Sequence, residues 1–123
     1  MGLFNAMLGN ASDVDTNEIA EEYEPILAEG ETIEAAFKMV RDLYIFTSKR
    51  LILVDKQGMT GRKVEYRSIP YRAVTQFTVE NAGTFDADSE MKIWISGQAE
   101  PLTRELKRGA NVEAIQKALA SIL

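Results

Sequence analysis

Half of the basic residues of this chain fall within one stretch of sequence. Residues 48–72, SKRLILVDKQGMTGRKVEYRSIPYR, contain seven of the fourteen Lys and Arg residues but only two of the nineteen acids, in a chain whose formal net charge is −5. Clustered ammonium and guanidinium groups attract anions, so an anionic lipid or a nucleic acid is one partner that this stretch would suit. The alternative is that its basic residues occupy solvated turns of a β-domain.

The other residues with reactive side chains offer no catalytic arrangement. The chain has no cysteine and no histidine, which excludes disulfides, thiolate metal sites and the usual general base near neutral pH. Asp86, Asp88 and Glu90 are spaced like the start of a calcium loop. However, Met91 and Gly97 stand where that loop needs a glycine and a bidentate acid. The sequence therefore predicts a protein that is not an enzyme and has no metal or other cofactor.

Composition also limits the partners and the compartment. Nucleic acid is disfavoured by the net negative charge and by the lack of a strand pair that combines aromatic with basic residues. No apolar run approaches the ~18 residues of a transmembrane helix. Residues 1–10, MGLFNAMLGN, lack the basic start of a secretory signal. We therefore expect a cytoplasmic protein whose contact with a membrane is at most weak and peripheral.

The N-terminal part of the chain is acidic and helical in its pattern. Residues 1–34 carry nine acids and no Lys or Arg. Four apolar residues follow the i, i+4, i+7, i+8 spacing of an amphipathic helix: Ile19, Tyr23, Ile26 and Leu27. Because Pro25 has no backbone N–H, we expect a kink or a short second helical piece there. Gly30 is expected to end the helical region.

From residue 31 onward the hydrophobic period changes to two, which indicates β-strands. We expect seven of them, at 31–39, 42–48, 50–55, 63–69, 73–80, 90–96 and 102–107. Ser48 and Lys49 separate the second strand from the third and predict a tight hairpin. A helical period returns at 112–123, where Leu119 is expected to pack against the sheets.

This order of elements predicts the fold class. It is mainly β with helices: a pleckstrin-homology-like (PH-like) barrel of two roughly orthogonal antiparallel sheets, capped by a C-terminal α-helix and preceded by an extra N-terminal helical segment. We place the helical segment at residues 1–30 and the barrel with its C-terminal helix at residues 31–123, within a single domain.

Four segments of the sequence carry a resemblance to a known family: ILAEGE, DLYIFTSKRLILVDKQGMTGRKVEYRSIPY, NAGTFDADSEMKIWISG and LKRGANVEAIQKAL. They closely resemble the bacterial PH-like family, which consists of small, mostly stand-alone domains, and the resemblance covers nearly the whole chain. It implies the fold described above and a tendency to self-assemble into rings. It implies no particular substrate.

Placing the strands divides the basic stretch into two groups. Successive turns of an antiparallel meander lie at opposite ends of the sheet, roughly 20 Å apart. One end then holds Lys49, Arg50 and Arg72, and the other holds Lys56, Arg62 and Lys63. Because the Debye length is ~8 Å at physiological salt, the two groups would act independently.

The resemblance also suggests where an anionic ligand would bind. Eukaryotic relatives of the fold bind phosphoinositide headgroups with Lys and Arg residues around the first hairpin. In this chain the candidate contacts for an anionic lipid headgroup, or for another anionic ligand, are Arg41, Lys56, Arg62 and Lys63. They form the alternative to the function that we expect.

The expected function is self-association, most simply in a ring. Five apolar residues near the N-terminus are candidate contacts, namely Phe4, Met7, Leu8, Ile19 and Tyr23, together with three basic residues, Lys49, Arg50 and Arg72. In a head-to-tail ring the acidic N-terminal helix of one subunit would meet the basic stretch of the next. A protein or peptide partner would instead pair with an exposed edge of the strand at 73–80.

Overall fold

The computed structural model describes residues 16–38, 42–57, 63–80, 89–106 and 112–123. The first elements described are α-helix α2 (Thr16–Tyr23) and the 3-10 helix η1 (Glu24–Ile26). Seven strands and two further helices follow: β1 (Ile33–Lys38), β2 (Asp42–Thr47), β3 (Arg50–Gln57), β4 (Lys63–Pro70), the 3-10 helix η2 (Tyr71–Ala73), β5 (Val74–Glu80), β6 (Ser89–Ile95), β7 (Leu102–Leu106) and α3 (Val112–Ile122).

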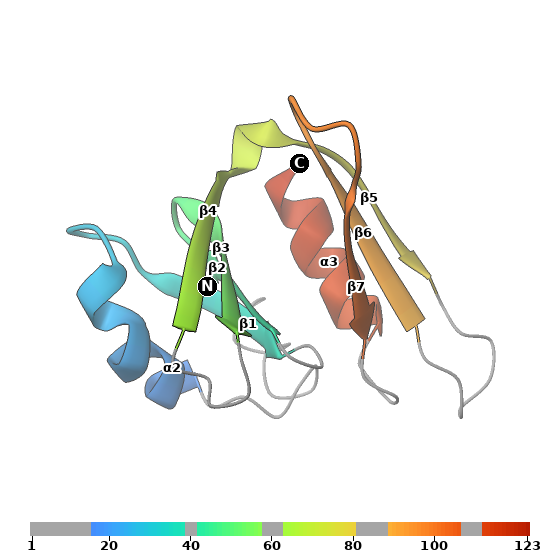
Figure 1. The fold of residues 1–123 in the computed structure, drawn as a ribbon. Coiled ribbons are helices and arrows are strands. Elements are labelled where there is room, and N and C mark those ends of the chain that lie inside the picture. The colour runs from blue at the N-terminus through green and yellow to red at the C-terminus, as the bar shows by residue number, and fades with distance from the viewer. Residues whose placement is uncertain (1–15, 39–41, 58–62, 81–88, 107–111) are drawn as a thin grey trace.

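The strands form two antiparallel sheets, as the sequence predicts (Figure 1). The first sheet has four strands in the order β1-β2-β3-β4, and the second has three in the order β5-β6-β7. Each strand pairs with its neighbour in the chain, so both sheets are meanders. The 3-10 helix η2 carries the chain from one sheet to the other.

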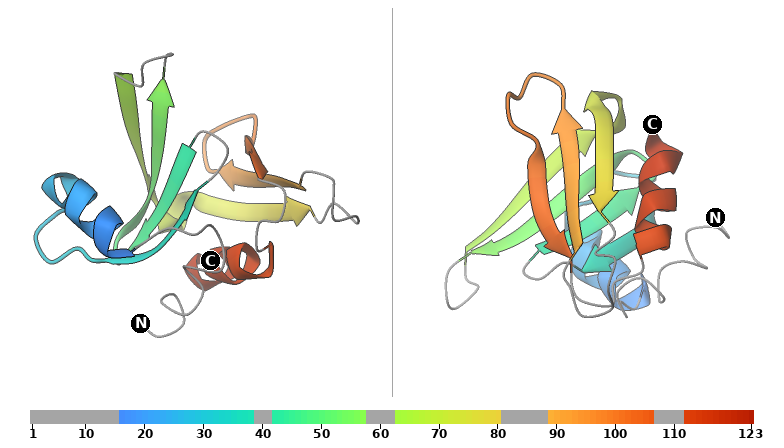
Figure 2. Two further views of the ribbon diagram at one scale, coloured as in Figure 1. Left: turned by 90° about the horizontal axis from the view of Figure 1, so that it is seen from below. Right: turned by 90° about the vertical axis from the view of Figure 1, so that its right-hand side faces the viewer.

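Helices α2 and α3 lie on opposite sides of the four-stranded sheet (Figures 1 and 2). On the outer side, Tyr23 of α2 meets Tyr66 of β4 edge to face, with ring centroids 6.3 Å apart. On the other side, α3 lies alongside β5 and buries Ile115 and Leu119. The predicted burial of Leu119 is confirmed, since it is completely inaccessible to solvent.

Most of the predicted element boundaries are confirmed to within two residues. The two-residue turn at Ser48 and Lys49 lies between β2 and β3. At Pro25 the chain forms η1, the short second helical piece that the missing N–H predicts. Gly30 follows with a φ of +79°, a left-handed conformation that glycine adopts without strain. Strand β4 continues through Pro70, one residue beyond the predicted end.

The main difference from the sequence analysis is that the four-stranded sheet is covered on both faces. A period of two predicts a half-buried strand at 31–39, yet Ala35, Ala36 and Phe37 are buried in succession along β1. Neighbouring residues are buried together along β2 as well, as at Ile45 and Phe46. The reason is α2, which packs against β1 and β4 on the outer face. Ala36 on β1 and its register partner Ile45 on β2 lie on the same face of the sheet, and both are completely buried.

Candidate functional site

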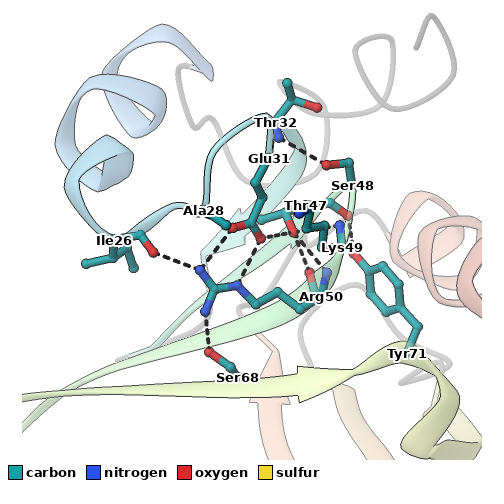
Figure 3. A network of polar contacts seen from close by, with 10 residues as sticks. All are labelled: Ile26, Ala28, Glu31, Thr32, Thr47, Ser48, Lys49, Arg50, Ser68 and Tyr71. Atoms are coloured by element: carbon teal, nitrogen blue, oxygen red, sulfur yellow. Dashed lines mark hydrogen bonds and ion pairs between the residues drawn. The ribbon is translucent and has the colours of Figure 1, made fainter.

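A buried carboxylate, Glu31, organises one end of the four-stranded sheet (Figure 3). Its Oε2 atom accepts hydrogen bonds from Arg50 Nε at 2.9 Å and from the Thr47 hydroxyl at 2.5 Å. Its Oε1 atom accepts from Arg50 Nη2 at 3.0 Å and from the Ala28 backbone N–H at 2.8 Å. The two side chains thus form a bidentate ion pair, and each carboxylate oxygen receives two hydrogen bonds.

Arg50 also joins three elements that lie far apart in the sequence. Its Nη2 atom donates to the backbone carbonyl of Ile26 in η1 at 2.8 Å. Its Nη1 atom donates to the hydroxyl of Ser68 in β4 at 2.6 Å. Because Arg50 itself begins β3, one guanidinium fixes η1 and the turn at Glu31 to the four-stranded sheet.

These contacts keep the Glu31 carboxylate ionised. The hydrogen bonds from Arg50 lower the pKa of Glu31 from its ordinary value of 4.5 to about 2. Burial acts in the opposite direction, because it disfavours the charged form. The hydrogen bonds from Thr47 and from the Ala28 backbone add to the lowering.

Thr47 connects this ion pair to the hairpin turn. Its hydroxyl oxygen accepts from the backbone N–H of Lys49 at 3.1 Å and of Arg50 at 3.0 Å. Its carbonyl accepts from the hydroxyl of Tyr71 in η2 at 2.5 Å, and burial raises the pKa of Tyr71. The turn between β2 and β3 is therefore held by side chains from both of its flanks.

A cleft of about 440 Å³ opens beside the ion pair. The cleft is lined by four apolar and four polar residues: Ile26, Leu27, Ala28 and Pro70, and Glu31, Lys49, Arg50 and Ser68. Lys49, Ser68 and Pro70 are exposed, whereas the Arg50 side chain is 25% accessible. The cleft thus combines apolar walls with donor groups of positive charge.

The structure separates the basic residues into two groups, as the sequence predicts. Arg50 is the register partner of Pro70 at one end of β3 and β4, and Gln57 is the partner of Lys63 at the other. The exposed cations of these groups are Lys49 and Arg72 at the first end and Lys56 and Lys63 at the second. Arg50 differs from the rest, because its charge is paired with Glu31 inside the same chain. Arg41 and Arg62 lie outside the described residues.

The structure also locates part of the predicted oligomer contact. Ile19 and Tyr23 are 9% and 3% exposed, and both belong to the core of their own chain. Their side chains are therefore not free to meet a second copy, because they cover the outer face of the four-stranded sheet instead. Phe4, Met7 and Leu8 lie outside the described residues.

A second ion pair joins the two sheets. Arg104 of β7 donates through Nε to the carboxylate of Asp42 in β2. Tyr44, two residues along β2, interacts electrostatically with both partners, and burial raises the pKa of Tyr44. Its side chain is buried, yet its hydroxyl has no hydrogen-bond partner within the described part of the chain.

Sequence reasoning missed both ion pairs. Glu31 was counted only as one acid of the N-terminal stretch, and Arg50 only as one base of the basic stretch. Their partnership spans 19 residues and depends on how the N-terminal segment crosses the sheet. No local pattern points to Glu31, because the end of a helix leaves free backbone carbonyls and not free N–H donors, so an acid is not expected there.

Two features are absent from the residues that the structure describes. Within the ranges that the structure describes, no three His, Cys, Asp or Glu residues come together in a way that would hold a metal ion. In the same part of the chain, no helix has the length and apolar character needed to cross a membrane.

Two meander sheets of four and three strands, followed by a helix against the second sheet, define a PH-like fold. The sequence model of the bacterial PH domain matches residues 2–123, and this chain belongs to that family.

Relatives of this chain match it over nearly their whole length, and two solved structures share its fold. The uncharacterized protein YjqA of Bacillus subtilis (strain 168) is 54% identical over 123 residues, which is 99% of this chain and 98% of the relative. A pleckstrin homology domain from Shewanella amazonensis SB2B, known from a crystal structure, is 60% identical in sequence and superposes with a TM-score of 0.79. The match covers 88% of this chain and 97% of that chain. A pleckstrin-homology domain protein from Shewanella loihica PV-4 is 54% identical, also with a TM-score of 0.79, over 93% of this chain and 97% of its own.

Proposed function

We propose that this protein is a non-catalytic interaction domain that works in the cytoplasm by assembling with copies of itself into a ring. The observation that carries the proposal is one group of exposed acids and one group of exposed cations on the described surface. Other exposed charges of both signs, such as Lys38, Glu65 and Lys117, lie outside these two groups. Exposed acids gather on α2, η1 and the turn that follows: Glu18, Glu21, Glu22, Glu24 and Glu29. Exposed cations stand at the ends of β3 and β4 and on η2: Lys49, Lys56, Lys63 and Arg72.

A surface of this kind favours head-to-tail contacts. The acidic side of one copy is complementary to the basic ends of the next, and a repeated heterologous contact closes into a ring when the rotation allows. Charge pairing mainly fixes orientation, whereas apolar groups supply most of the affinity. Phe4, Met7 and Leu8 remain the apolar candidates, since Ile19, Tyr23 and Arg50 are engaged within their own chain.

The edge of the three-stranded sheet is a second surface for such contacts. Among the described strands, β5 pairs on one side only, with β6. Thr75, Gln76 and Thr78 on β5 are exposed. A strand of another copy, or an extended peptide, would pair with this edge through backbone hydrogen bonds.

Light scattering on the full chain tests the proposal. We expect a mass of three or more times the 13.7 kDa chain at micromolar concentration. The monomer mass under the same conditions would refute self-assembly.

Binding to anionic lipid is the alternative function, because Lys56 and Lys63 stand exposed at the same end of adjacent strands. A basic residue near an anionic surface contributes about 1 kcal/mol, so this pair together with the predicted contact Arg62 would supply only about 3 kcal/mol. That is weaker than a millimolar association, which corresponds to about 4 kcal/mol. We therefore expect no co-sedimentation with anionic vesicles at physiological salt. Pelleting that is lost in a Lys56→Gln/Lys63→Gln variant would favour the lipid function instead.

A further inference from the structure

The cleft beside the Glu31–Arg50 pair has donors that the pair leaves unused. The Nε and Nη2 atoms of Arg50 donate to the Glu31 carboxylate, and Nη1 donates one of its hydrogens to the Ser68 hydroxyl oxygen. An Nη1 group carries two hydrogens, so one remains. Ser68 accepts from Arg50 and keeps its own O–H to donate. The exposed ammonium of Lys49 completes the set.

The net charge of these groups is that of one cation. Lys49 and Arg50 contribute two positive charges, and the ionised Glu31 contributes one negative charge. The Glu31 carboxylate is turned into the protein, where its side chain is completely buried and both oxygens are hydrogen-bonded. Although Glu31 lines the cleft, both of its oxygens already accept two hydrogen bonds, so the groups left to bind a ligand are donors, and their net charge matches a monoanion.

We propose that this cleft binds a small organic monocarboxylate. The carboxylate of the ligand accepts hydrogen bonds from Arg50 Nη1, the Ser68 hydroxyl and the Lys49 ammonium, while its aliphatic or aromatic body lies against Ile26, Leu27 and Pro70. The volume of about 440 Å³ lies within the range of roughly 300–1,000 Å³ that is typical of small-molecule sites. A phosphate monoester fits less well, because it carries about −1.5 to −2 charges at neutral pH.

The site is independent of the lipid alternative and goes beyond the proposed self-assembly. Lys56 and Lys63 stand at the opposite end of β3 and β4, so they serve as a distant basic control. The cleft is formed by one chain alone, from η1, the turn that follows it, β3 and β4.

Ligand-observed NMR titration of the full chain with sodium hexanoate tests the proposal, because this readout works whatever the mass of an assembly. We expect saturable binding with a Kd of roughly millimolar order, as is usual for so small a ligand. Ser68→Ala should raise the Kd about fivefold through the loss of one hydrogen bond. Lys49→Gln should raise it about threefold, since an exposed charge contributes less. Lys63→Gln should leave the Kd unchanged.

Two further probes identify what the cleft recognises. Hexanol has the same apolar body without the charge, and inorganic phosphate has the charge without the body. Both should bind at least about tenfold more weakly than hexanoate if carboxylate and body act together. Equal binding of hexanol, tighter binding of phosphate, or an unchanged Kd in both cleft variants would overturn the proposal.

Light scattering with and without hexanoate separates this proposal from self-assembly. We expect hexanoate to leave the mass unchanged. A monomer that binds hexanoate would refute the ring but not the cleft. A ring that dissociates as hexanoate is added would overturn the small-ligand proposal, because the cleft would then hold a carboxylate of the neighbouring copy.

Discussion

At the scale of single residues, the chain places one ionised acid where water does not reach. Glu31 is stable there because two donors from Arg50, one from Thr47 and one from the backbone replace its hydration. Breaking a buried pair by removing one partner commonly costs about 3–5 kcal/mol, since the other charge is left without compensation. The pair is therefore a strict requirement for the packing of η1 against the sheet.

We predict that Glu31 makes stability depend on acid pH. Its pKa falls from 4.5 in the unfolded chain to about 2 in the fold, so the folded state favours the ionised form. The resulting stability, about 3 kcal/mol, is complete above the unfolded pKa and is lost as the pH falls from about 5 to 2. Urea unfolding across this range should show the loss in the natural chain.

The variant Glu31→Gln should have a lower free energy of unfolding at pH 7, by a few kcal/mol, and a flatter pH profile below pH 5. Glu29→Gln is the matched control, because Glu29 is an exposed neighbour. It should keep both the stability and the pH profile of the natural chain. A Glu31→Gln profile as steep as that of the natural chain would show that other carboxylates cause the acid sensitivity.

Removing the buried polar group of Tyr44 should not lower stability, in contrast to removing the charge of Glu31. A buried hydroxyl without a partner costs about 1–3 kcal/mol, and Tyr44 is such a group among the described residues. We predict that Tyr44→Phe leaves the free energy of unfolding unchanged or raises it by about 1 kcal/mol. Tyr71→Phe is the control, since it removes the bond to the Thr47 carbonyl and should lower stability by about 1 kcal/mol. A clear destabilisation by Tyr44→Phe would mean that its hydroxyl is satisfied in solution.

At the scale of elements, α3 is the part of the fold whose face is best defined. Ala114, Ile115, Ala118 and Leu119 are buried on one side of it, while Gln116 and Lys117 are exposed. We predict that Leu119→Asp lowers the free energy of unfolding by several kcal/mol, because a charge would be forced into an apolar contact. Gln116→Asp introduces the same charge on the exposed side and should change stability by less than about 1 kcal/mol. Equal melting temperatures for the two variants would contradict this orientation of the helix.

Local patterns were sufficient to predict most elements. The β-branched and aromatic residues of β2 and β3, the missing N–H of Pro25 and the helical period from Val112 each act within a few residues, and the structure agrees at all three places. Local patterns could not show that α2 covers the outer face of the four-stranded sheet, because an amphipathic stripe indicates that a face is buried but not against what. The burial of Ala36 follows from that docking alone.

The candidate site was predicted less well than the fold. Counting charges found the basic stretch but could not separate Arg50, which is paired internally, from Lys49, which is exposed. The difference is set by the turn at Gly30, which brings Glu31 to the start of β3. Contacts between residues so distant in sequence depend on the whole topology, so a charge pattern does not reveal them.

At the scale of the whole molecule, the uneven charge should control association. The acids of α2 form one exposed group, and the cations at the ends of β3 and β4 form another. Raising the salt from 0.1 M to 1 M shortens the Debye length from about 10 Å to about 3 Å, so exposed charges then attract each other much less. We predict that the oligomer has a larger dissociation constant in 1 M salt than in 0.1 M salt, so that dilution of the protein splits it sooner.

A charge reversal on α2 makes this prediction specific. Glu21→Lys/Glu22→Lys should lower the mass measured by light scattering at a fixed micromolar concentration, because the acidic side would repel the cations of the next copy. Glu100→Lys/Glu113→Lys is the control, since it changes the net charge by the same amount at exposed positions away from α2. If self-association depends on net charge alone, both variants will change the mass equally. If the acidic side of α2 is the contact, only the first will, and Arg72→Glu added to it should restore part of the lost mass.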